Sequence, residues 1–229
     1  MIPDVMNQRL KNIYDGFSLH QRNKFLANEI EPDVMWDKSI KGVTLQIDLS
    51  EKVRDAVCKL QNQLITLEPD ALLLTPRPSQ HISFNQVIYW GGQYKLGLNQ
   101  TWTAIEKDFL SKLQNLDNRL PSFTISFVKL IPMTTAIIWA ALDDNDEMQK
   151  LRSMLKSSLP FPLETMKENT FIHTTVARYK TKLRDPQRII QLFEKYQTPI
   201  TMEVKEIILR KENLYPSLET TELARIRLQ

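Results

Sequence analysis

The sequence predicts an α+β fold made of two pseudo-symmetric lobes, each an antiparallel sheet backed by helices, with a groove between them. Three observations support this class. From about residue 41 onward, short runs of β-type patterning alternate with longer runs of helical patterning. The order strand, helix, strand occurs twice along the chain. Each copy also has a histidine at a similar place, His81 in one and His173 in the other. Two copies of such a unit commonly pack as two lobes.

Residues 1–40 precede the repeated part and are predicted to form a helical extension. Apolar residues recur there at helical spacing: Met6, Leu10, Ile13, Tyr14 and Phe17. The apolar residues at 25–30 suggest that a second helix follows. We expect the extension to pack on the main body, and a lid or a partner-docking segment is the alternative.

The first copy of the repeated unit is predicted at about 42–130. Ser50 is a predicted N-cap, since serine accepts hydrogen bonds from the first free amides of a helix. The expected elements, in order, are a strand at 42–49, a helix at 50–66, the strand that holds His81, a helix at 101–115 and a strand at 122–130.

The second copy is predicted at about 135–229 and follows the same order. It has a strand at 135–142, a helix at 145–158, the His173 strand at 171–179, a helix at 186–196 and two further strands. The first strand of each copy begins at a similar distance before its histidine. We therefore interpret residues 41–229 as one bilobal domain that arose by internal duplication.

Composition places the chain among ordinary globular proteins. Of its 229 residues, 42% are hydrophobic and 25% are charged, and no apolar run reaches the roughly 20 residues that cross a bilayer. The first residues lack the apolar core of a secretory signal. The one cysteine, Cys58, cannot form an internal disulfide and is interpreted as a structural helix residue. We expect a soluble monomer in the cytoplasm or another reducing compartment.

The net charge of +3 is mildly basic. Such a balance allows an anionic ligand, but it falls short of the dense cationic surface of a protein that binds duplex DNA.

The candidate chemistry lies in two short motifs, "HIS" at 81–83 and "HTT" at 173–175. Residues i and i+2 of a strand point to the same face, so each strand presents one imidazole and one hydroxyl. Two purely structural histidines are the alternative. Serine and threonine make up about one residue in eight, so a hydroxyl two places after both histidines would arise by chance on the order of once in sixty.

Two imidazoles and two hydroxyls around one groove would suit a phosphodiester. One neutral histidine could remove a proton from the attacking oxygen while the other, protonated, gives one to the leaving oxygen. Ser83 and Thr175 would donate hydrogen bonds to the non-bridging oxygens. This chemistry needs no cofactor. A metal site made of His20, His81 and His173 is disfavoured, because no close-spaced ligand cluster accompanies them. His20 lacks the motif and is expected to be solvated.

The paired motifs resemble the two H-x-[ST] motifs of the two-histidine (2H) phosphoesterase superfamily, which includes LigT-like RNA 2′,5′-ligases and cyclic nucleotide phosphodiesterases. The resemblance covers about residues 41–229; the first motif has serine, which the pattern permits, and the extension is unusual. It implies that His81, Ser83, His173 and Thr175 are catalytic, with His81 as the acid and His173 as the base.

The resemblance also implies an activity: a metal-independent phosphoesterase that opens 2′,3′-cyclic phosphates or acts on 2′-linked nucleotides and RNA ends. The partner would then be a nucleotide or an RNA. A non-catalytic RNA or nucleotide-binding module with the same groove is the alternative, and the intact histidine and hydroxyl pairs in both copies argue against it.

Five further residues are candidates for binding the substrate. Arg77, in the turn before His81, is expected at the rim of the groove. Arg178, five residues after His173, should face away from it by strand parity, which favours a salt bridge over a phosphate contact. Three aromatic residues surround the Gly91-Gly92 turn and could stack on a base, although core packing explains at least one of them equally well: Tyr89, Trp90 and Tyr94.

Overall fold

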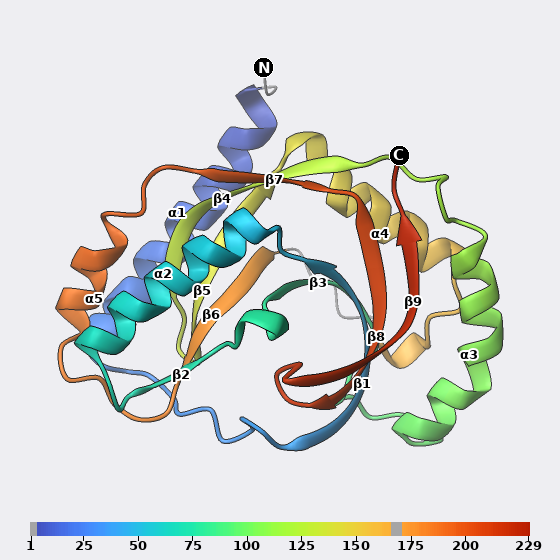
Figure 1. Ribbon diagram of the computed structural model, residues 1–229, viewed down its shortest axis with the longest axis horizontal. Coiled ribbons are helices and arrows are strands. Elements are labelled where there is room, and N and C mark those ends of the chain that lie inside the picture. The colour runs from blue at the N-terminus through green and yellow to red at the C-terminus, as the bar shows by residue number, and fades with distance from the viewer. Residues whose placement is uncertain (1–3, 166–170) are drawn as a thin grey trace.

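In the computed structural model, which describes residues 4–165 and 171–229, nine strands form one strongly curled antiparallel sheet with helices packed around it (Figure 1). The strand order is β7-β4-β5-β6-β3-β1-β8-β9, and β2 pairs with β6. The strands are β1 (Ser39–Asp48), β2 (Leu72–Leu74), β3 (His81–Ile88), β4 (Phe123–Pro132), β5 (Ala136–Asp143), β6 (Ile172–Tyr179), β7 (Ile200–Val204), β8 (Glu206–Leu214) and β9 (Glu219–Arg227).

The sheet has two halves that meet at the histidine strands. Within the described residues, β3 and β6 share a single residue pair, Ile82 with Thr174, whereas the other neighbouring strands pair over longer stretches. One half holds β2, β4, β5, β6 and β7, and the other holds β1, β3, β8 and β9. The predicted α+β class with two sheet halves is confirmed.

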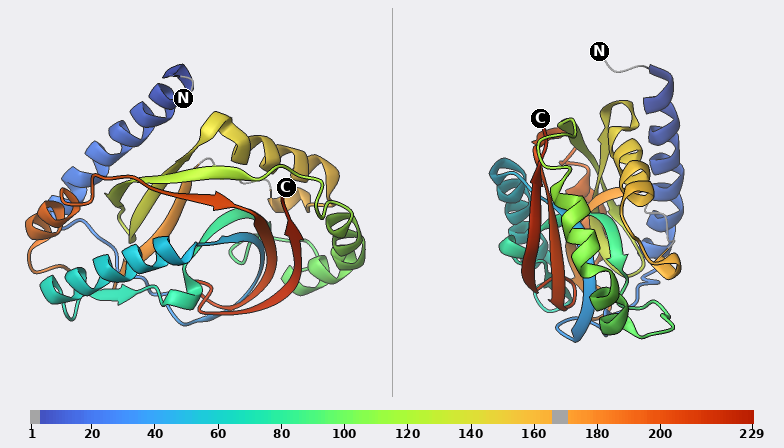
Figure 2. Two further views of the ribbon diagram at one scale, coloured as in Figure 1. Left: turned by 45° about the horizontal axis from the view of Figure 1, so that its top comes forward. Right: turned by 90° about the vertical axis from the view of Figure 1, so that its right-hand side faces the viewer.

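Strand pairing does not follow the two sequence copies. β4 belongs to the first copy but pairs with β5 and β7, and β8 belongs to the second copy but pairs with β1. Figures 1 and 2 show β7 and β8 passing as a nearly continuous band from one half to the other. The segments 42–130 and 135–229 therefore do not correspond to the two halves of the sheet. Their origin by duplication stays a prediction.

The helices also cross between the copies. They are α1 (Asp4–Leu26), α2 (Glu51–Leu67), α3 (Leu98–Gln114), α4 (Glu147–Ser158) and α5 (Pro186–Phe193). α2 follows β1 in sequence but packs on β2, β6, β7 and α5, and α4 follows β5 but packs on β3. Each histidine strand is thus covered by a helix from the other sequence copy. Ser50 occupies the N-cap position of α2 as predicted, although its hydroxyl makes no capping bond.

The amino-terminal helix packs on the main body. α1 contacts β4, β5 and α5, and it continues to Leu26, so the second helix predicted near residues 25–30 does not form. Tyr14 is buried; its hydroxyl donates to the Ala141 carbonyl at 2.7 Å and accepts from the Ile172 amide at 3.3 Å. The side chains of Met6, Leu10 and Ile13 lie outside those described. In the described part of the chain, no helix has both the length and the hydropathy needed to cross a bilayer.

Candidate active site

The four motif side chains share one face of the sheet at the junction of its halves. Ile82 and Thr174 are opposite each other and fully buried. Their neighbours on each strand therefore face the other way, and these are His81 and Ser83 on β3, and His173 and Thr175 on β6. Antiparallel register across the Ile82 and Thr174 pair sets His81 beside Thr175 and Ser83 beside His173.

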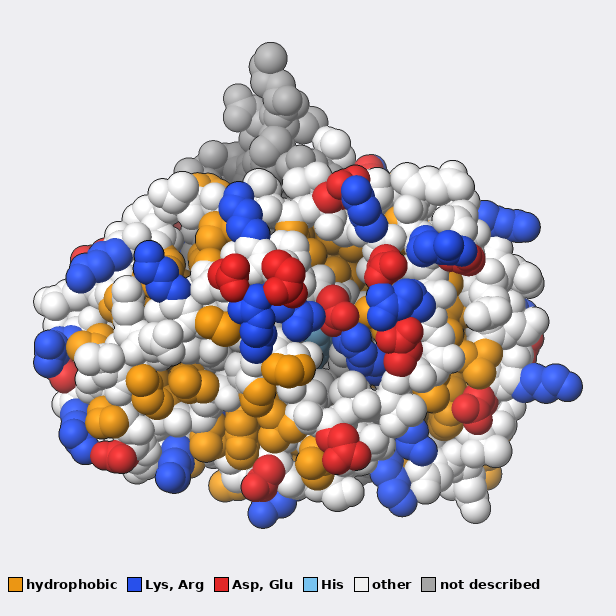
Figure 3. Space-filling model, viewed as in Figure 1, with side chains coloured by type: hydrophobic (Ala, Val, Ile, Leu, Met, Phe, Trp, Pro, Cys, Tyr) orange, Lys and Arg blue, Asp and Glu red, His pale blue; other side chains and the backbone are white. Residues whose placement is uncertain are grey.

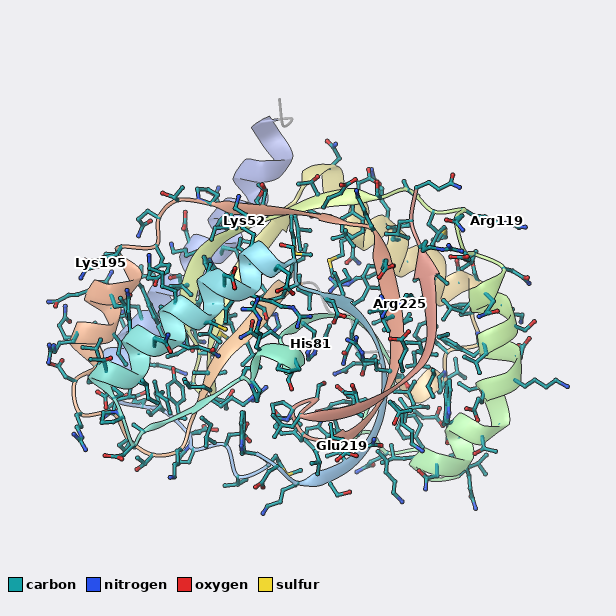
Figure 4. The ribbon with its side chains drawn as sticks, viewed as in Figure 1. Lys52, His81, Arg119, Lys195, Glu219 and Arg225 are labelled. Carbon is teal, nitrogen blue, oxygen red and sulfur yellow. The ribbon has the colours of Figure 1, made fainter. Side chains whose placement is uncertain are left out.

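All four residues line one pocket of about 250 Å³. A histidine side chain is visible in a hollow at the middle of the face shown in Figure 3, with Lys, Arg, Asp and Glu side chains around it. Figure 4 shows His81 between the β6 side and the β8 and β9 side of the molecule. The other lining residues are Thr44, Thr75, Ser79, Gln86, Tyr89, Trp90, Thr174, Arg178, Glu212, Tyr215, Pro216 and Ser217.

Two helices hold the strands where they separate. The guanidinium of Arg152 on α4 donates to the Phe84 carbonyl at 2.7 Å and the Ser83 carbonyl at 3.0 Å. On the other side, the amide of Gln61 on α2 donates to the Val176 carbonyl at 2.8 Å and to the Thr75 carbonyl at 2.7 Å. The Val176 carbonyl also accepts from the Thr75 amide at 3.2 Å. Buried carbonyls are costly without hydrogen-bond partners, so these contacts stabilise the open junction. Burial lowers the pKa of Arg152 to about 10, which leaves it charged at neutral pH.

His81 has one nitrogen fixed and one facing the pocket. Its Nδ1 lies 2.8 Å from the Ser79 carbonyl, so this nitrogen carries a hydrogen and donates it. Nε2 lies 3.4 Å from the Ser83 hydroxyl. Burial lowers the pKa of His81, and the Arg210 guanidinium also lowers it. The Ser79 carbonyl and the carboxylates of Glu212 and Asp48 act in the opposite direction.

His173 lies in a more cationic environment. Burial lowers its pKa to about 4; the charges of His81, Arg152 and Arg178 add to this, and the Phe171 carbonyl opposes it. Among the described residues, no partner meets hydrogen-bond geometry at its Nδ1. Its ring packs against Phe171, with centroids 5.8 Å apart. His173 is therefore neutral at pH 7.

The His173→Gln variant should lose less stability in acid than the unsubstituted protein. The pKa of about 4 in the folded state lies below the ordinary value of 6.5. The unfolded chain therefore binds the proton first, and His173 costs stability as the pH falls from 6.5 towards 4. By linkage the cost at pH 5 is on the order of 2 kcal/mol. Urea unfolding at pH 7 and pH 5 measures the difference. His20→Gln, which removes an exposed histidine of α1, is the control, and equal pH dependence for the two variants would refute the assignment.

Arg178 lies in the pocket, and the prediction that it faces away was wrong. Against β5, strand β6 has a bulge: Ala177 pairs with Ile137 and Thr175 with Ile138, which leaves Val176 as an extra residue. A bulge reverses the alternation of faces beyond it, so Arg178 lines the same pocket as His173. The predicted salt bridge is present, because Arg178 Nη1 lies 3.0 Å from Asp33 Oδ2.

Of the remaining substrate-binding candidates, two line the pocket and two do not. Arg77 does not line the pocket; it forms ion pairs with Glu51 at 2.5 Å and Asp55 at 2.7 Å on α2. Tyr89 and Trp90 line the pocket. The Tyr94 hydroxyl instead accepts from the Tyr89 amide at 2.7 Å and bonds the Thr165 hydroxyl at 2.8 Å, which gives it a structural role.

The carboxy-terminal strands add pocket residues that sequence reasoning missed. Glu212 on β8 accepts hydrogen bonds from the Thr44 hydroxyl at 3.1 Å and the Gln46 amide at 3.2 Å, and also from the Ser217 hydroxyl. Tyr215 packs against Trp90, with ring centroids 5.1 Å apart. These residues carry no motif, and only the pairing of β8 with β1 brings them to the site.

The other titratable candidates lie elsewhere. His20 is exposed on α1, as predicted, and Cys58 is a partly buried residue of α2. Over residues 4–165 and 171–229, no group of three or more His, Cys, Asp or Glu side chains is arranged to hold a metal ion.

Solved structures with the same fold cover most of the chain. LigT of E. coli without ligand has a TM-score of 0.55 at 15% identity, over 84% of this chain and 99% of that chain. A protein of Thermus thermophilus has a TM-score of 0.55 at 16% identity, over 82% and 97%. A conserved protein of unknown function from Agrobacterium tumefaciens has a TM-score of 0.65 at 14% identity, over 88% and 97%. At these identities the likeness concerns the fold.

The family comparison is more specific. No curated protein matches the chain. The model of the 2′-5′ RNA ligase superfamily matches residues 95–215, more than half of the chain. The matched segment contains His173 and Thr175 and begins after His81 and Ser83. With this match and a LigT-like fold, the chain belongs to the 2′-5′ RNA ligase superfamily of two-histidine phosphoesterases.

Proposed function

We propose that the protein is a metal-independent phosphoesterase that acts on 2′,3′-cyclic phosphates, or on 2′-linked nucleotides and RNA ends. Its catalytic residues would be His81, Ser83, His173 and Thr175. The observation that carries the proposal is the meeting of both motifs in one pocket, on the two strands joined by the Ile82 and Thr174 pair. Structures of E. coli LigT with phosphate and with 3′-AMP support a phosphate-bearing ligand for this fold.

The surroundings of the histidines favour different roles for them. The charges that act on His173 are all positive, which keeps the ring neutral and suits a base. His81 has both signs of charge nearby: the carboxylates of Glu212 and Asp48 raise its pKa and the Arg210 guanidinium lowers it. Asp48 pairs with it across β1 and β3. Carboxylates favour the protonated ring, and an anionic phosphate beside it would raise its pKa further. His81 is therefore assigned as the acid and His173 as the base.

In ring opening, His173 would take a proton from water as the water oxygen attacks phosphorus. The bond from phosphorus to one ribose oxygen then breaks, and His81 Nε2 gives its proton to that oxygen, which leaves a phosphomonoester. Ser83 and Thr175 would donate to the non-bridging oxygens throughout. Arg178 contributes a positive charge to the pocket wall, and Tyr89 and Trp90 offer faces on which a base can stack.

A substrate panel tests the proposal. The purified protein is incubated with 2′,3′-cyclic nucleotides, 2′-5′ oligonucleotides and RNA that ends in a cyclic phosphate, with EDTA present. We expect turnover of at least one class, unaffected by EDTA. Tight binding of a panel member without turnover would favour a non-catalytic nucleotide-binding module, and turnover that EDTA abolishes would contradict the metal-independent mechanism.

A further inference from the structure

Residues 31–38, which we call the strap, connect α1 to β1 and hold both sides of the pocket. The strap precedes the segment that the family model matches. At one end, the strap forms hydrogen bonds with the half of the sheet that contains β5 and β6. At the other end, it forms hydrogen bonds with the turn between β8 and β9. These backbone bonds are Glu31 N to Thr134 O at 2.8 Å, Asp33 N to Tyr179 O at 2.8 Å, Asp37 N to Tyr215 O at 2.9 Å and Tyr215 N to Lys38 O at 3.0 Å.

The strap supplies the carboxylate that holds Arg178. The side chains of Asp33 and Arg178 are only 7% and 16% exposed, so their ion pair at 3.0 Å is largely shielded from water. Asp33 is itself fixed, because its Oδ1 accepts from the Met35 amide at 3.0 Å. The guanidinium of Arg178 also lies over the Tyr215 ring, 4.9 Å from its centroid. Arg178 is thus held between the strap and the opposite wall of the pocket.

The position of Asp33 affects how Arg178 can interact with Glu212, the carboxylate that lines the pocket. Arg178 is the one Lys or Arg among the described pocket residues, and Glu212 is the one carboxylate. They come from opposite halves of the sheet, on β6 and β8. A buried guanidinium without an ionic partner costs free energy, and pairing with a carboxylate reduces that cost. Asp33 neutralises the charge of Arg178 from outside the cavity, although among the described residues neither Asp33 Oδ2 nor Arg178 Nε has a partner in hydrogen-bond geometry. Arg178 therefore need not pair with Glu212 across the space that a ligand would occupy.

We propose that Asp33 is a positioning residue: it holds Arg178 on the pocket wall with the guanidinium turned towards an anionic substrate, which makes the amino-terminal extension a working part of the site. This inference rests on the proposed function, since it takes the pocket as the place where a phosphate binds. It goes beyond the motif residues because Asp33 lies outside both sequence copies and touches the pocket only through Arg178.

The test compares inorganic phosphate binding with turnover. Calorimetry measures the affinity for phosphate, and kcat and KM are measured on a cyclic nucleotide that the unsubstituted protein hydrolyses. The Asp33→Asn variant, which keeps the size and the oxygen that accepts from Met35, should bind phosphate about tenfold or more weakly, as expected for a displaced binding group. KM should rise more than kcat falls. The Asp33→Glu variant, which keeps the charge, should recover most of the affinity.

A double-mutant cycle separates positioning from general stability. If Asp33 acts through Arg178, Asp33→Asn should have no further effect on phosphate affinity in an Arg178→Met background. Asp15→Asn is the matched control, since Asp15 forms an exposed ion pair between the same extension and Lys129 at 2.6 Å; it should leave the affinity unchanged.

Several outcomes would overturn the inference. Additive effects in the cycle, or a folded Asp33→Asn protein with phosphate affinity within twofold of the original, would do so. Phosphate binding without turnover of any cyclic phosphate would contradict the proposed reaction. The phosphate affinities of the variants would still decide whether Asp33 positions Arg178. If the unsubstituted protein binds no phosphate, the role of Asp33 is refuted, whereas turnover of a panel member would still support the proposed reaction.

Discussion

The His81→Ala and His173→Ala variants are each expected to lower the rate on a cyclic phosphate by roughly 10²-fold or more, the usual contribution of a positioned proton-transfer group. The expected pH profile of kcat/KM is bell-shaped. Its acid limb follows the protonation of His173, whose pKa burial lowers to about 4. Its alkaline limb follows deprotonation of His81, whose pKa is also lowered by burial, so the maximum should lie below pH 7.

Each histidine variant should remove one limb of this profile. His173→Ala should lose the acid limb and His81→Ala the alkaline limb, if the assignment of base and acid is correct. The opposite pattern would exchange the two roles and keep the paired mechanism. His20→Ala should behave like the unsubstituted protein. A folded single variant of His81 or His173 with near-full activity would exclude the paired mechanism altogether.

Loss of either motif hydroxyl should cost roughly 10-fold to 10³-fold in kcat, the range measured when one hydrogen-bond donor to a developing charge is removed. The Ser83→Ala and Thr175→Ala variants keep the strands intact, because both side chains face the pocket. Thr175→Ser retains the donor and should recover most of the rate. Thr201→Ala, on the exposed face of strand β7, is a matched control and should leave the rate unchanged. Equal rates for Thr175→Ala and Thr201→Ala would show that the hydroxyl does not contact the reacting phosphate.

Sequence patterns predicted most of the elements because these depend on local periodicity, and the repeated order of elements with the paired motifs led us to expect the two motifs in one groove. The i and i+2 rule places His81 with Ser83 on one face of β3, and the structure has this arrangement. The short strand β2 was missed, since three residues carry too little pattern. The crossing of β4 and β8 between halves was also missed, because pairing partners far apart in sequence leave no local signal.

The residues of the pocket wall were less predictable, because tertiary pairing determines which side chains reach the pocket. Strand parity gave the wrong face for Arg178 because the bulge at Val176 is set by pairing with β5, which the residues around it do not reveal. Arg77 had two acidic partners within reach on α2, and its spacing from Glu51 and Asp55 gave no indication of this. Asp33 and Glu212 reach the site only through the tertiary arrangement of the strap and β8.

The exchange of helices between the two copies makes the site a property of the whole chain. The carbonyls beside the first motif are bonded by Arg152 from α4, and those beside the second by Gln61 from α2. α3 of the first copy also packs on β3, but the Ser83, Phe84 and Val176 carbonyls depend on side chains from the other copy, so a division near residue 134 would separate each motif from this support. Folding must bring residues more than 60 positions apart together before either motif is supported, and such non-local pairing slows folding.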